Sequence, residues 1–114
     1  MNFQNETPLV SVIIPMYNAR LYIAETIQTV LQQSYPNVEI ILVDDCSNDG
    51  SFELVSKTFG HHSNISILQN LINSGVGHSR NVGVTHAKGR FICFLDADDL
   101  WLPRKLEKQV RFML

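Results

Sequence analysis

Three carboxylates lie close together in the segment FICFLDADDLWLP, which spans residues 91–103. Asp96, Asp98 and Asp99 directly follow an apolar run that is typical of a buried strand. Alternate side chains of an extended chain point the same way, so Asp96 and Asp98 are expected to share one side. Two carboxylates about 4 Å apart repel by roughly 4 kcal/mol at an effective dielectric constant near 20. The spacing therefore predicts that a cation binds here.

The cation that fits this pattern is Mg²⁺ or Mn²⁺. These ions prefer oxygen ligands, typically take one or two protein carboxylates, and complete their coordination with water and phosphate oxygens. We therefore expect a divalent metal with a diphosphate on its other side. The alternative is that Asp98 or Asp99 caps a turn ahead of a helix opened by Pro103, and Asp99 is the better placed of the two for that role.

Apolar segments of strand length alternate with segments of helical period along the chain. Strands are predicted at 9–14, 38–43, 65–68 and 90–95; helices are predicted at 19–33, along a stripe of Phe52, Val55 and Phe59, at 77–87, and after Pro103 with Leu106, Val110 and Met113 facing inward. Pro15 is expected to end the first strand, and Ser47 or Asp49 to cap the second helix. This order predicts an α/β fold with a mostly parallel, Rossmann-like sheet flanked by helices.

Polar residues follow the predicted strands at the points where the strands end. They are Pro15-Met16-Tyr17-Asn18 after the first strand, Asp44-Asp45 after the second, and Asp96-Ala97-Asp98 after the fourth. Ligands of parallel α/β sheets collect outside the carboxyl ends of the strands. We therefore expect these residues to gather at one edge of the sheet and to form a binding site there.

Composition limits the classes of function that the chain can have. Its 114 residues correspond to about one small domain, with 45% hydrophobic residues and a net charge of −2. A nucleic-acid-binding domain would show a basic face instead. Cys46 and Cys93 have no metal-binding spacing and are interpreted as reduced thiols of a cytosolic protein. No secretory signal and no membrane-spanning apolar segment is predicted.

Two short motifs resemble known signatures but lack a required part. GVGHSR, residues 75–80, begins like a dinucleotide-binding fingerprint, but Arg80 stands where the third glycine belongs. DADDL, residues 96–100, resembles the nucleophile motif of haloacid-dehalogenase-type phosphatases, but Leu100 replaces the usual Thr or Val and the motif follows the wrong strand. Neither class is favoured.

Three longer segments together resemble one family. VSVIIPMYNARLYIAETIQTVLQQSYPNVEIILVDDCSNDGS, NSGVGHSRNVGVTHAKG and FICFLDADDLWLPRKLEKQ closely resemble the nucleotide-binding half of family 2 glycosyltransferases, which have the GT-A fold. The resemblance runs from about Val10 to Leu114. It implies an N-terminal tail at residues 1–8 and, at 9–114, the donor-binding part of a GT-A domain that stops before the acceptor part.

The resemblance implies a role for each matching position around the nucleoside. Pro15, Tyr17 and Asn18 match the loop that packs against the nucleoside. Asp45, the second acid of VDD, matches the residue that accepts a hydrogen bond from the base, typically uracil. Cys46 replaces the glycine that usually follows VDD.

The resemblance also implies which residues lie near the phosphates. Arg80 in SRN matches a basic residue near the nucleotide, and the family more often has alanine where Ser79 stands. Asp96 and Asp98 match the ends of the Asp-x-Asp motif, the first near the ribose and the second on the metal. Asp98 is thus the implied metal ligand, with Mn²⁺ or Mg²⁺ as cofactor.

The activity implied is metal-dependent, inverting transfer of a sugar from a nucleotide-sugar donor, expected to be UDP-linked, to a saccharide, lipid-linked or other hydroxyl acceptor. The catalytic base is expected beyond Leu114, so no catalytic residue is assigned and the chain alone is expected to be inactive and to self-associate. The setting expected is the cytoplasm, including the inner face of the membrane. The alternative is a non-catalytic nucleotide-sugar-binding module or an inactive truncated fragment.

Overall fold

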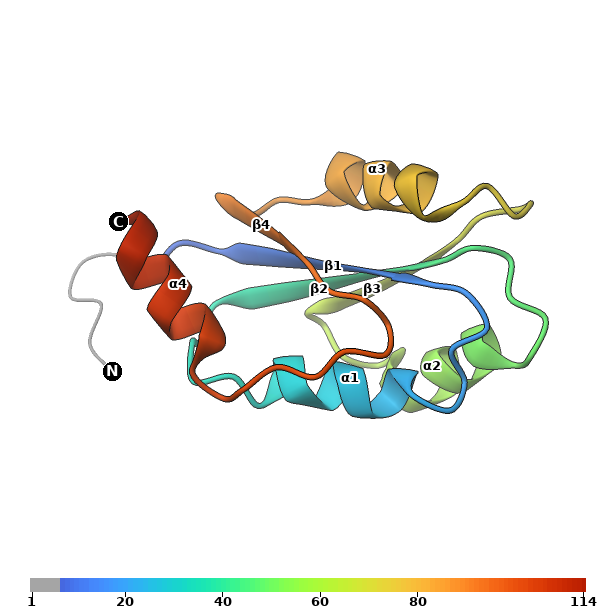
Figure 1. Cartoon of the computed structure of the whole chain (residues 1–114), viewed down its shortest axis with the longest axis horizontal. Coiled ribbons are helices and arrows are strands. Elements are labelled where there is room, and N and C mark those ends of the chain that lie inside the picture. Colours follow the sequence, from blue (N-terminus) through green and yellow to red (C-terminus); the bar gives the residue numbers. More distant parts are fainter. Residues whose placement is uncertain (1–6) are drawn as a thin grey trace.

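A four-stranded parallel sheet in the order β3-β2-β1-β4 forms the centre of the computed structural model, which describes residues 7–114 (Figure 1). The elements are β1 (Val10–Met16), α1 (Ile23–Leu31), β2 (Val38–Asp44), α2 (Ser51–Phe59), β3 (Ile65–Gln69), α3 (Val76–His86), β4 (Phe91–Phe94) and α4 (Lys105–Met113). All three strand pairs are parallel, and a helix connects each strand to the next along the chain. The predicted α/β fold is confirmed.

Helices cover both faces of the sheet. In Figure 1, α3 lies over one face and α1 and α2 lie over the other. The larger core cluster joins the sheet to α1, α2 and α4, and a smaller one of Ile13, Ile41 and Val43 lies under α3. A Cβ at Gly83 would collide with the side chain of Ile13, so this glycine lets α3 pack directly on β1. Because both of its faces are covered, β1 is buried along its whole length.

The prediction that Pro15 ends the first strand is wrong, because β1 continues through Met16. The oxygen of Ile13 accepts from Leu95 on the β4 side, and that of Met16 accepts from Asp45 on the β2 side. Backbone polar groups therefore alternate between the two neighbours, and the missing N–H of Pro15 faces β4. The β4 ladder ends at the pair Ile13 and Phe94, so this proline interrupts no hydrogen bond.

The first helix is shorter than the predicted range 19–33, because α1 begins at Ile23 and ends at Leu31. The residues that precede α1 form a loop. Two side chains hold this loop in place: one lies just before α2 and the other is the first residue of α2. The backbone N–H of Ala19 donates to Oγ of Ser51, and that of Arg20 donates to the carboxylate of Asp49. Because these bonds fix the backbone of Ala19 and Arg20 in the loop, the helix begins only at Ile23.

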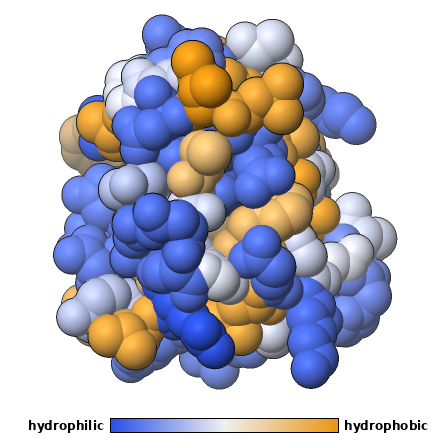
Figure 2. Space-filling model, turned by 90° about the vertical axis from the view of Figure 1, so that its right-hand side faces the viewer, coloured by the Kyte–Doolittle hydropathy of each residue, from blue (hydrophilic) through white to orange (hydrophobic). Residues whose placement is uncertain are grey.

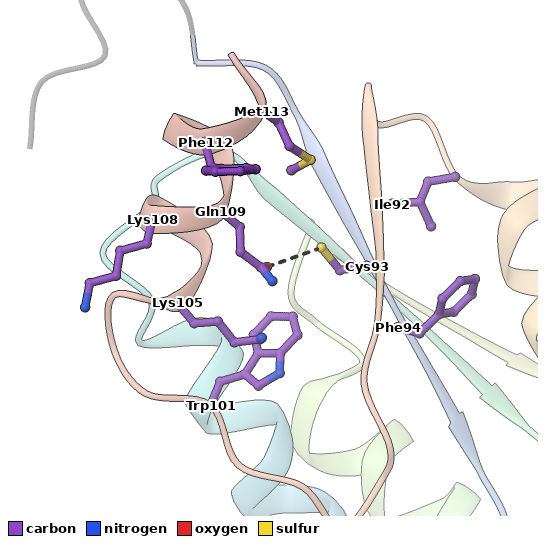
Figure 3. A pocket seen from close by; sticks show the side chains of 9 residues that line it. All are labelled: Ile92, Cys93, Phe94, Trp101, Lys105, Lys108, Gln109, Phe112 and Met113. Atoms are coloured by element: carbon purple, nitrogen blue, oxygen red, sulfur yellow. Dashed lines mark hydrogen bonds between the residues drawn. The ribbon is translucent and has the colours of Figure 1, made fainter.

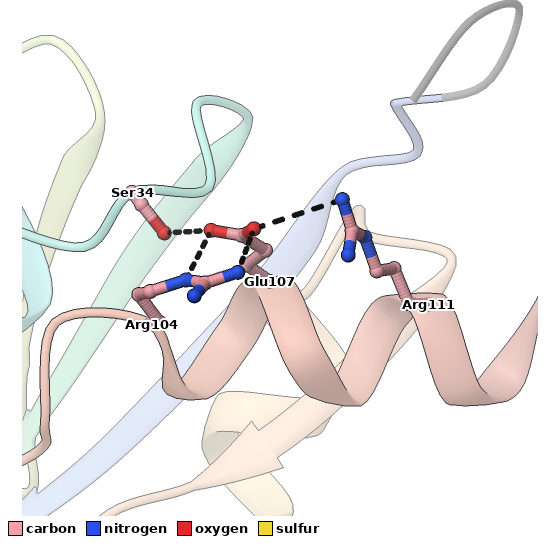
Figure 4. Close-up of polar contacts among 4 residues, drawn as sticks. All are labelled: Ser34, Arg104, Glu107 and Arg111. Atoms are coloured by element: carbon pink, nitrogen blue, oxygen red, sulfur yellow. Dashed lines mark hydrogen bonds and ion pairs between the residues drawn. The ribbon is translucent and has the colours of Figure 1, made fainter. Parts of the chain in front are cut away.

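The last helix buries Leu106 and Val110 as predicted, but Met113 is exposed, so that part of the prediction is wrong. The third buried residue of α4 is Glu107. Its carboxylate accepts from Oγ of Ser34 at 2.5 Å and from Arg104, with Arg111 3.9 Å away (Figure 4). These contacts compensate the buried negative charge of Glu107. The residue lies on the buried face of α4, where a hydrophobic side chain would be expected.

The fourth strand lies at an edge of the sheet and is only partly buried, so the prediction of a buried strand there is wrong. Within residues 7–114 it pairs with β1 alone, and Ile92 and Phe94 are 42% and 48% exposed. Of the predicted tail at 1–8, only Thr7 and Pro8 lie within the described residues. Their carbonyls accept hydrogen bonds from Asn37 and Tyr35, so both are attached to the segment between α1 and β2.

Candidate functional site

The loops after β1, β2 and β3 meet at the end of the sheet that is formed by the carboxyl ends of the strands. Figure 2 faces this end of the molecule and shows a mostly hydrophilic surface with hydrophobic residues between. Leu21, Leu71 and Ile72 are exposed hydrophobic residues of these loops. The expectation that the polar residues following β1 and β2 gather at one edge is met.

Hydrogen bonds join the loop after β1 to the loop after β2. The backbone N–H of Asn18 donates to Oγ of Ser47 at 2.8 Å, and Oδ1 of Asn18 accepts from the N–H of Asn48 at 3.0 Å. Ser47 in turn donates to the fully buried carboxylate of Asp44. Asn18 has a left-handed φ of 49°, a conformation that asparagine tolerates better than most residues. Asn18 thus clamps the two loops, and its side chain does not line the pocket described below.

Asp45 is almost fully buried, and three donors contact its carboxylate. Oδ1 accepts from Nδ2 of Asn70 at 2.9 Å and from the N–H of Ser74 at 2.8 Å, while Oδ2 accepts from the N–H of Gly75 at 2.9 Å. Burial raises the pKa of this carboxyl, but the three hydrogen bonds outweigh it and leave the pKa below its ordinary value. Asp45 is therefore a carboxylate fixed in one orientation.

The backbone of Gly75 explains how this orientation arises. Gly75 precedes α3 with φ 92° and ψ 163°, a combination that is accessible essentially only to glycine. In this conformation its N–H points to Oδ2 of Asp45, so the start of α3 is attached to the end of β2. Sequence reasoning missed Asn70, Ser74 and Gly75 as partners of Asp45, although the NSG run at 73–75 was a turn signal beside the predicted site.

A small pocket of about 70 Å³ lies against Asp45. Its lining consists of Pro15, Met16, Tyr17, Asp45, Val76 and Ser79. Tyr17 is half exposed, so its ring is accessible at this edge. Known ligand pockets are several times larger, which means that this one accepts an edge of a ring rather than a whole ligand. Three of the predicted residues, Pro15, Tyr17 and Asp45, are brought together here.

The acidic loop at 95–104 is held against α1 by a row of polar side chains. Thr26 donates to the carbonyl of Ala97 at 2.7 Å, Thr29 accepts from the N–H of Trp101 at 3.2 Å, and Gln33 donates to the carbonyl of Leu102 at 2.7 Å. Thr26 and Thr29 share a face of α1 because they are three residues apart, and Gln33 lies two residues after the end of the helix. Sequence reasoning missed this row. It fixes the backbone that carries Asp96 and Asp98.

Arg80 of α3 reaches the first acid of this loop. Its Nη2 lies 3.6 Å from Oδ1 of Asp96, and its guanidinium carbon lies 5.8 Å from the centre of the Phe94 ring. Nε of Arg80 is buried without a hydrogen-bond partner in the described part of the chain. Two predicted residues from separate segments are therefore neighbours.

Asp98 is exposed, and within residues 7–114 its carboxylate makes no hydrogen bond or ion pair. The same holds for Asp99, so neither supports the turn-cap alternative. In this range no group of three or more His, Cys, Asp or Glu side chains could hold a metal by itself. One or two accessible carboxylates fit a Mg²⁺ or Mn²⁺ ion that takes its other ligands from water and a diphosphate.

A larger pocket, of about 550 Å³, lies between β4 and α4 (Figure 3). Its wall includes Cys93 and Phe94 on the strand, Trp101, and Lys105 and Phe112 on the helix. Burial raises the pKa of the Cys93 thiol, which keeps it protonated. None of the predicted site residues lines this pocket, and it offers no carboxylate for a metal.

Comparison with known families identifies the chain. The sequence profile of Glycosyl transferase family 2 matches residues 11–114. The chain therefore belongs to glycosyl transferase family 2, as the segment resemblance predicted, and its parallel sheet with flanking helices is the GT-A arrangement. No helix within residues 7–114 is long and apolar enough to cross a membrane.

Curated relatives are similar over nearly the whole chain. TuaG of Bacillus subtilis (strain 168), whose name assigns it to teichuronic acid biosynthesis as a glycosyltransferase, is 46% identical over 96% of this chain and 44% of its own length. WfaP of Escherichia coli, a UDP-Glc:alpha-D-GlcNAc-diphosphoundecaprenol beta-1,3-glucosyltransferase, is 40% identical over 92% of this chain and 41% of its own length. The chain thus spans less than half of either relative.

Solved structures agree in fold. S. aureus TarS 1-349 in complex with UDP-GlcNAc has a TM-score of 0.84 and 34% identity, covering 91% of this chain and 30% of that protein. The mannosyltransferase PcManGT from Pyrobaculum calidifontis, in complex with GDP-Man and Mn²⁺, has a TM-score of 0.88 and 30% identity, covering 96% of this chain and 33% of that protein.

Proposed function

We propose that this chain is the donor-binding part of a metal-dependent, inverting glycosyltransferase that uses a UDP-linked sugar. The observation that carries the proposal is the carboxylate of Asp45, fixed at the wall of a small pocket at the carboxyl edge of the sheet. Membership of glycosyl transferase family 2 and the UDP-GlcNAc complex of the similar protein TarS support it.

Asp45 retains one place for a ligand. A carboxylate has about four acceptor positions. Two on Oδ1 are taken by Asn70 and Ser74, and one on Oδ2 is taken by Gly75. The remaining position on Oδ2 accepts the ring N–H of uracil, and the accessible ring of Tyr17 stacks on the base. Pro15 forms part of the pocket wall, and Asn18 acts by clamping the two loops that surround the nucleoside.

Asp96, Asp98 and Arg80 act on the remainder of the donor. Asp98 supplies the carboxylate for Mn²⁺ or Mg²⁺, and the Mn²⁺ complex of the similar protein PcManGT supports this choice. When bound, the metal neutralises charge on the leaving diphosphate. Asp96 faces the ribose. Arg80, placed beside Asp96, contributes positive charge next to the nucleotide.

The acceptor site and the catalytic base belong, in this proposal, to the part of the longer relatives that this chain does not span. An inverting transfer needs such a base to remove the proton of the acceptor hydroxyl. The acceptor is a saccharide, lipid-linked or other hydroxyl compound, and the name of WfaP, which specifies a lipid-linked acceptor, supports the lipid-linked class. A cytoplasmic setting at the membrane surface fits such an acceptor.

Calorimetric titration of the purified chain with UDP, CDP and GDP in the presence of Mn²⁺ tests the proposal. We expect UDP to bind about tenfold or more tightly than CDP, because N3 of cytosine carries no proton and leaves the buried acceptor of Asp45 unpaired. Asp45→Asn should abolish the preference for UDP over CDP. Glu53→Gln, an exposed change on α2, is the matched control and should keep that preference. Equal affinities for UDP and CDP would show that Asp45 does not select the base.

A transfer assay with several UDP-sugars and mixed acceptors tests where the base lies. The 114-residue chain is expected to show no acceptor-dependent turnover, since the proposal places the base in the part of the longer relatives that this chain does not span. Turnover at a rate comparable to that of a longer relative would place the base within this chain.

A further inference from the structure

Ser79 is a polar residue in the wall of the Asp45 pocket that the proposed function leaves without a role. It lies on α3, is 0% exposed, and lines the pocket together with Asp45 and Tyr17. A buried serine facing a pocket is unusual enough to require an account of its hydrogen bonds.

Within the described part of the chain, the hydrogen bonds around Ser79 leave its hydroxyl proton without an acceptor. Nδ2 of Asn70 donates to Oδ1 of Asp45 at 2.9 Å and to Oγ of Ser79 at 3.0 Å, so its two hydrogens are both engaged. Oγ of Ser79 is therefore an acceptor in this bond. Within residues 7–114 nothing accepts the proton of the Ser79 hydroxyl. A buried donor without a partner is costly, and a ligand in the pocket can supply the acceptor.

The amide of Asn70 also fixes the relative positions of the two groups. Because one nitrogen bonds both Oδ1 of Asp45 and Oγ of Ser79, the carboxylate and the hydroxyl lie in the same wall, and Oδ2 is the carboxylate oxygen that keeps an open acceptor position. A ring N–H with an adjacent carbonyl oxygen is complementary to this pair. Uracil carries that edge at N3–H, between O2 and O4.

We propose that the Ser79 hydroxyl donates a hydrogen bond to a carbonyl oxygen of the uracil ring while Oδ2 of Asp45 accepts its N3–H. This inference rests on the proposed function and makes Ser79 a second residue that selects the base. Guanine presents the same N–H and carbonyl pattern at N1–H and O6, and the UDP-GlcNAc complex of the similar protein TarS is what favours uracil here.

The test compares UDP with 2-thio-UDP and 4-thio-UDP, in which sulfur, a weak acceptor, replaces one carbonyl oxygen. We expect the wild-type chain, titrated calorimetrically with Mn²⁺, to bind one of the two analogues about three- to tenfold more weakly than UDP. Ser79→Ala should bind UDP more weakly and should no longer distinguish that analogue from UDP. Ser63→Ala, an exposed loop serine, is the control and should retain the discrimination.

The analogue series separates base contact from a purely structural effect. Ser79→Ala also removes the acceptor for Asn70, and that loss would weaken UDP and both analogues by the same factor. An unchanged ratio of affinities in Ser79→Ala overturns the proposal, as does a wild-type chain that binds all three nucleotides equally. If the wild-type chain binds no UDP at all, the proposed function itself fails. Thermal melts of each variant establish that the folded state is retained.

Discussion

The guanidinium of Arg80 lies 3.6 Å from the carboxylate of Asp96, measured from Nη2 to Oδ1, and so connects α3 to the acidic loop. Both side chains are substantially exposed, 40% and 60% respectively. Exposed ion pairs of this kind contribute about 0–1 kcal/mol to stability. The pair therefore contributes little to the stability of the fold, which is consistent with the proposal that both residues face the nucleotide.

A double-mutant cycle of Arg80→Ala and Asp96→Asn distinguishes a role in nucleotide binding from a role in the stability of the fold. We expect a coupling free energy of unfolding below about 1 kcal/mol in urea titrations, because water screens the pair. Each single change should nevertheless weaken the binding of UDP with Mn²⁺ severalfold. A coupling of several kcal/mol with unchanged nucleotide affinity would assign the pair to the fold instead.

The two acids at 98 and 99 are expected to differ in their effect on metal-dependent binding. Asp98→Asn should weaken the Mn²⁺-dependent binding of UDP about tenfold or more, because a charged oxygen ligand becomes a neutral amide. Asp99→Asn, the matched control one position later, should have a smaller effect. Calorimetry with UDP at several Mn²⁺ concentrations measures both, and equal losses at the two positions would contradict the assignment of Asp98 to the metal.

Gly75→Ala tests the connection between α3 and Asp45. A side chain at φ 92° and ψ 163° is strained whatever space surrounds it, and nothing lies within 4 Å of the added Cβ. We expect a loss of about 1–3 kcal/mol in the free energy of unfolding, together with weaker UDP binding as the N–H leaves Oδ2 of Asp45. Gly77→Ala, also in open space but inside the helix, is the control and should be neutral or stabilising. Equal effects of the two changes would show that the conformation of Gly75 is not required.

The fold could be predicted because the central strands carry a strong local signal. β1 and β2 are buried on both faces, and their continuous apolar runs reflect this directly. The end of β1 could not be predicted, since the effect of Pro15 depends on where β4 leaves the sheet. The start of α1 was missed for a similar reason: Ser51 and Asp49, which hold the preceding loop, come about 30 positions later.

The sequence pattern indicated where the acids of the candidate site lie, but it did not indicate the residues that hold them in place. Asp45 directly follows β2 and Asp96 comes two residues after β4, at the carboxyl ends of strands where parallel sheets bind ligands. The partners of Asp45 lie 25 to 30 residues further along the chain, and only the pairing of β2 with β3 brings Asn70 beside it. The same limit applies to Glu107, whose burial depends on Ser34 in a distant loop.

Glu107 makes stability depend on pH. Hydrogen bonds from Arg104 and Ser34 lower the pKa of its carboxyl from 4.5 to about 2. A carboxyl whose pKa is lowered by folding stabilises the folded state above its unfolded pKa, and this contribution is lost as pH falls from about 4.5 towards about 2.

We expect the melting temperature to fall over this range. Glu107→Gln should have a lower melting temperature at pH 7, and its melting temperature should depend less on pH in acid. Glu53→Gln, on the exposed face of α2, is the control and should follow the wild-type curve. Thermal melts by circular dichroism between pH 7 and pH 3 measure all three proteins. If Glu107→Gln keeps the wild-type acid dependence, the loss of stability in acid arises from other carboxylates.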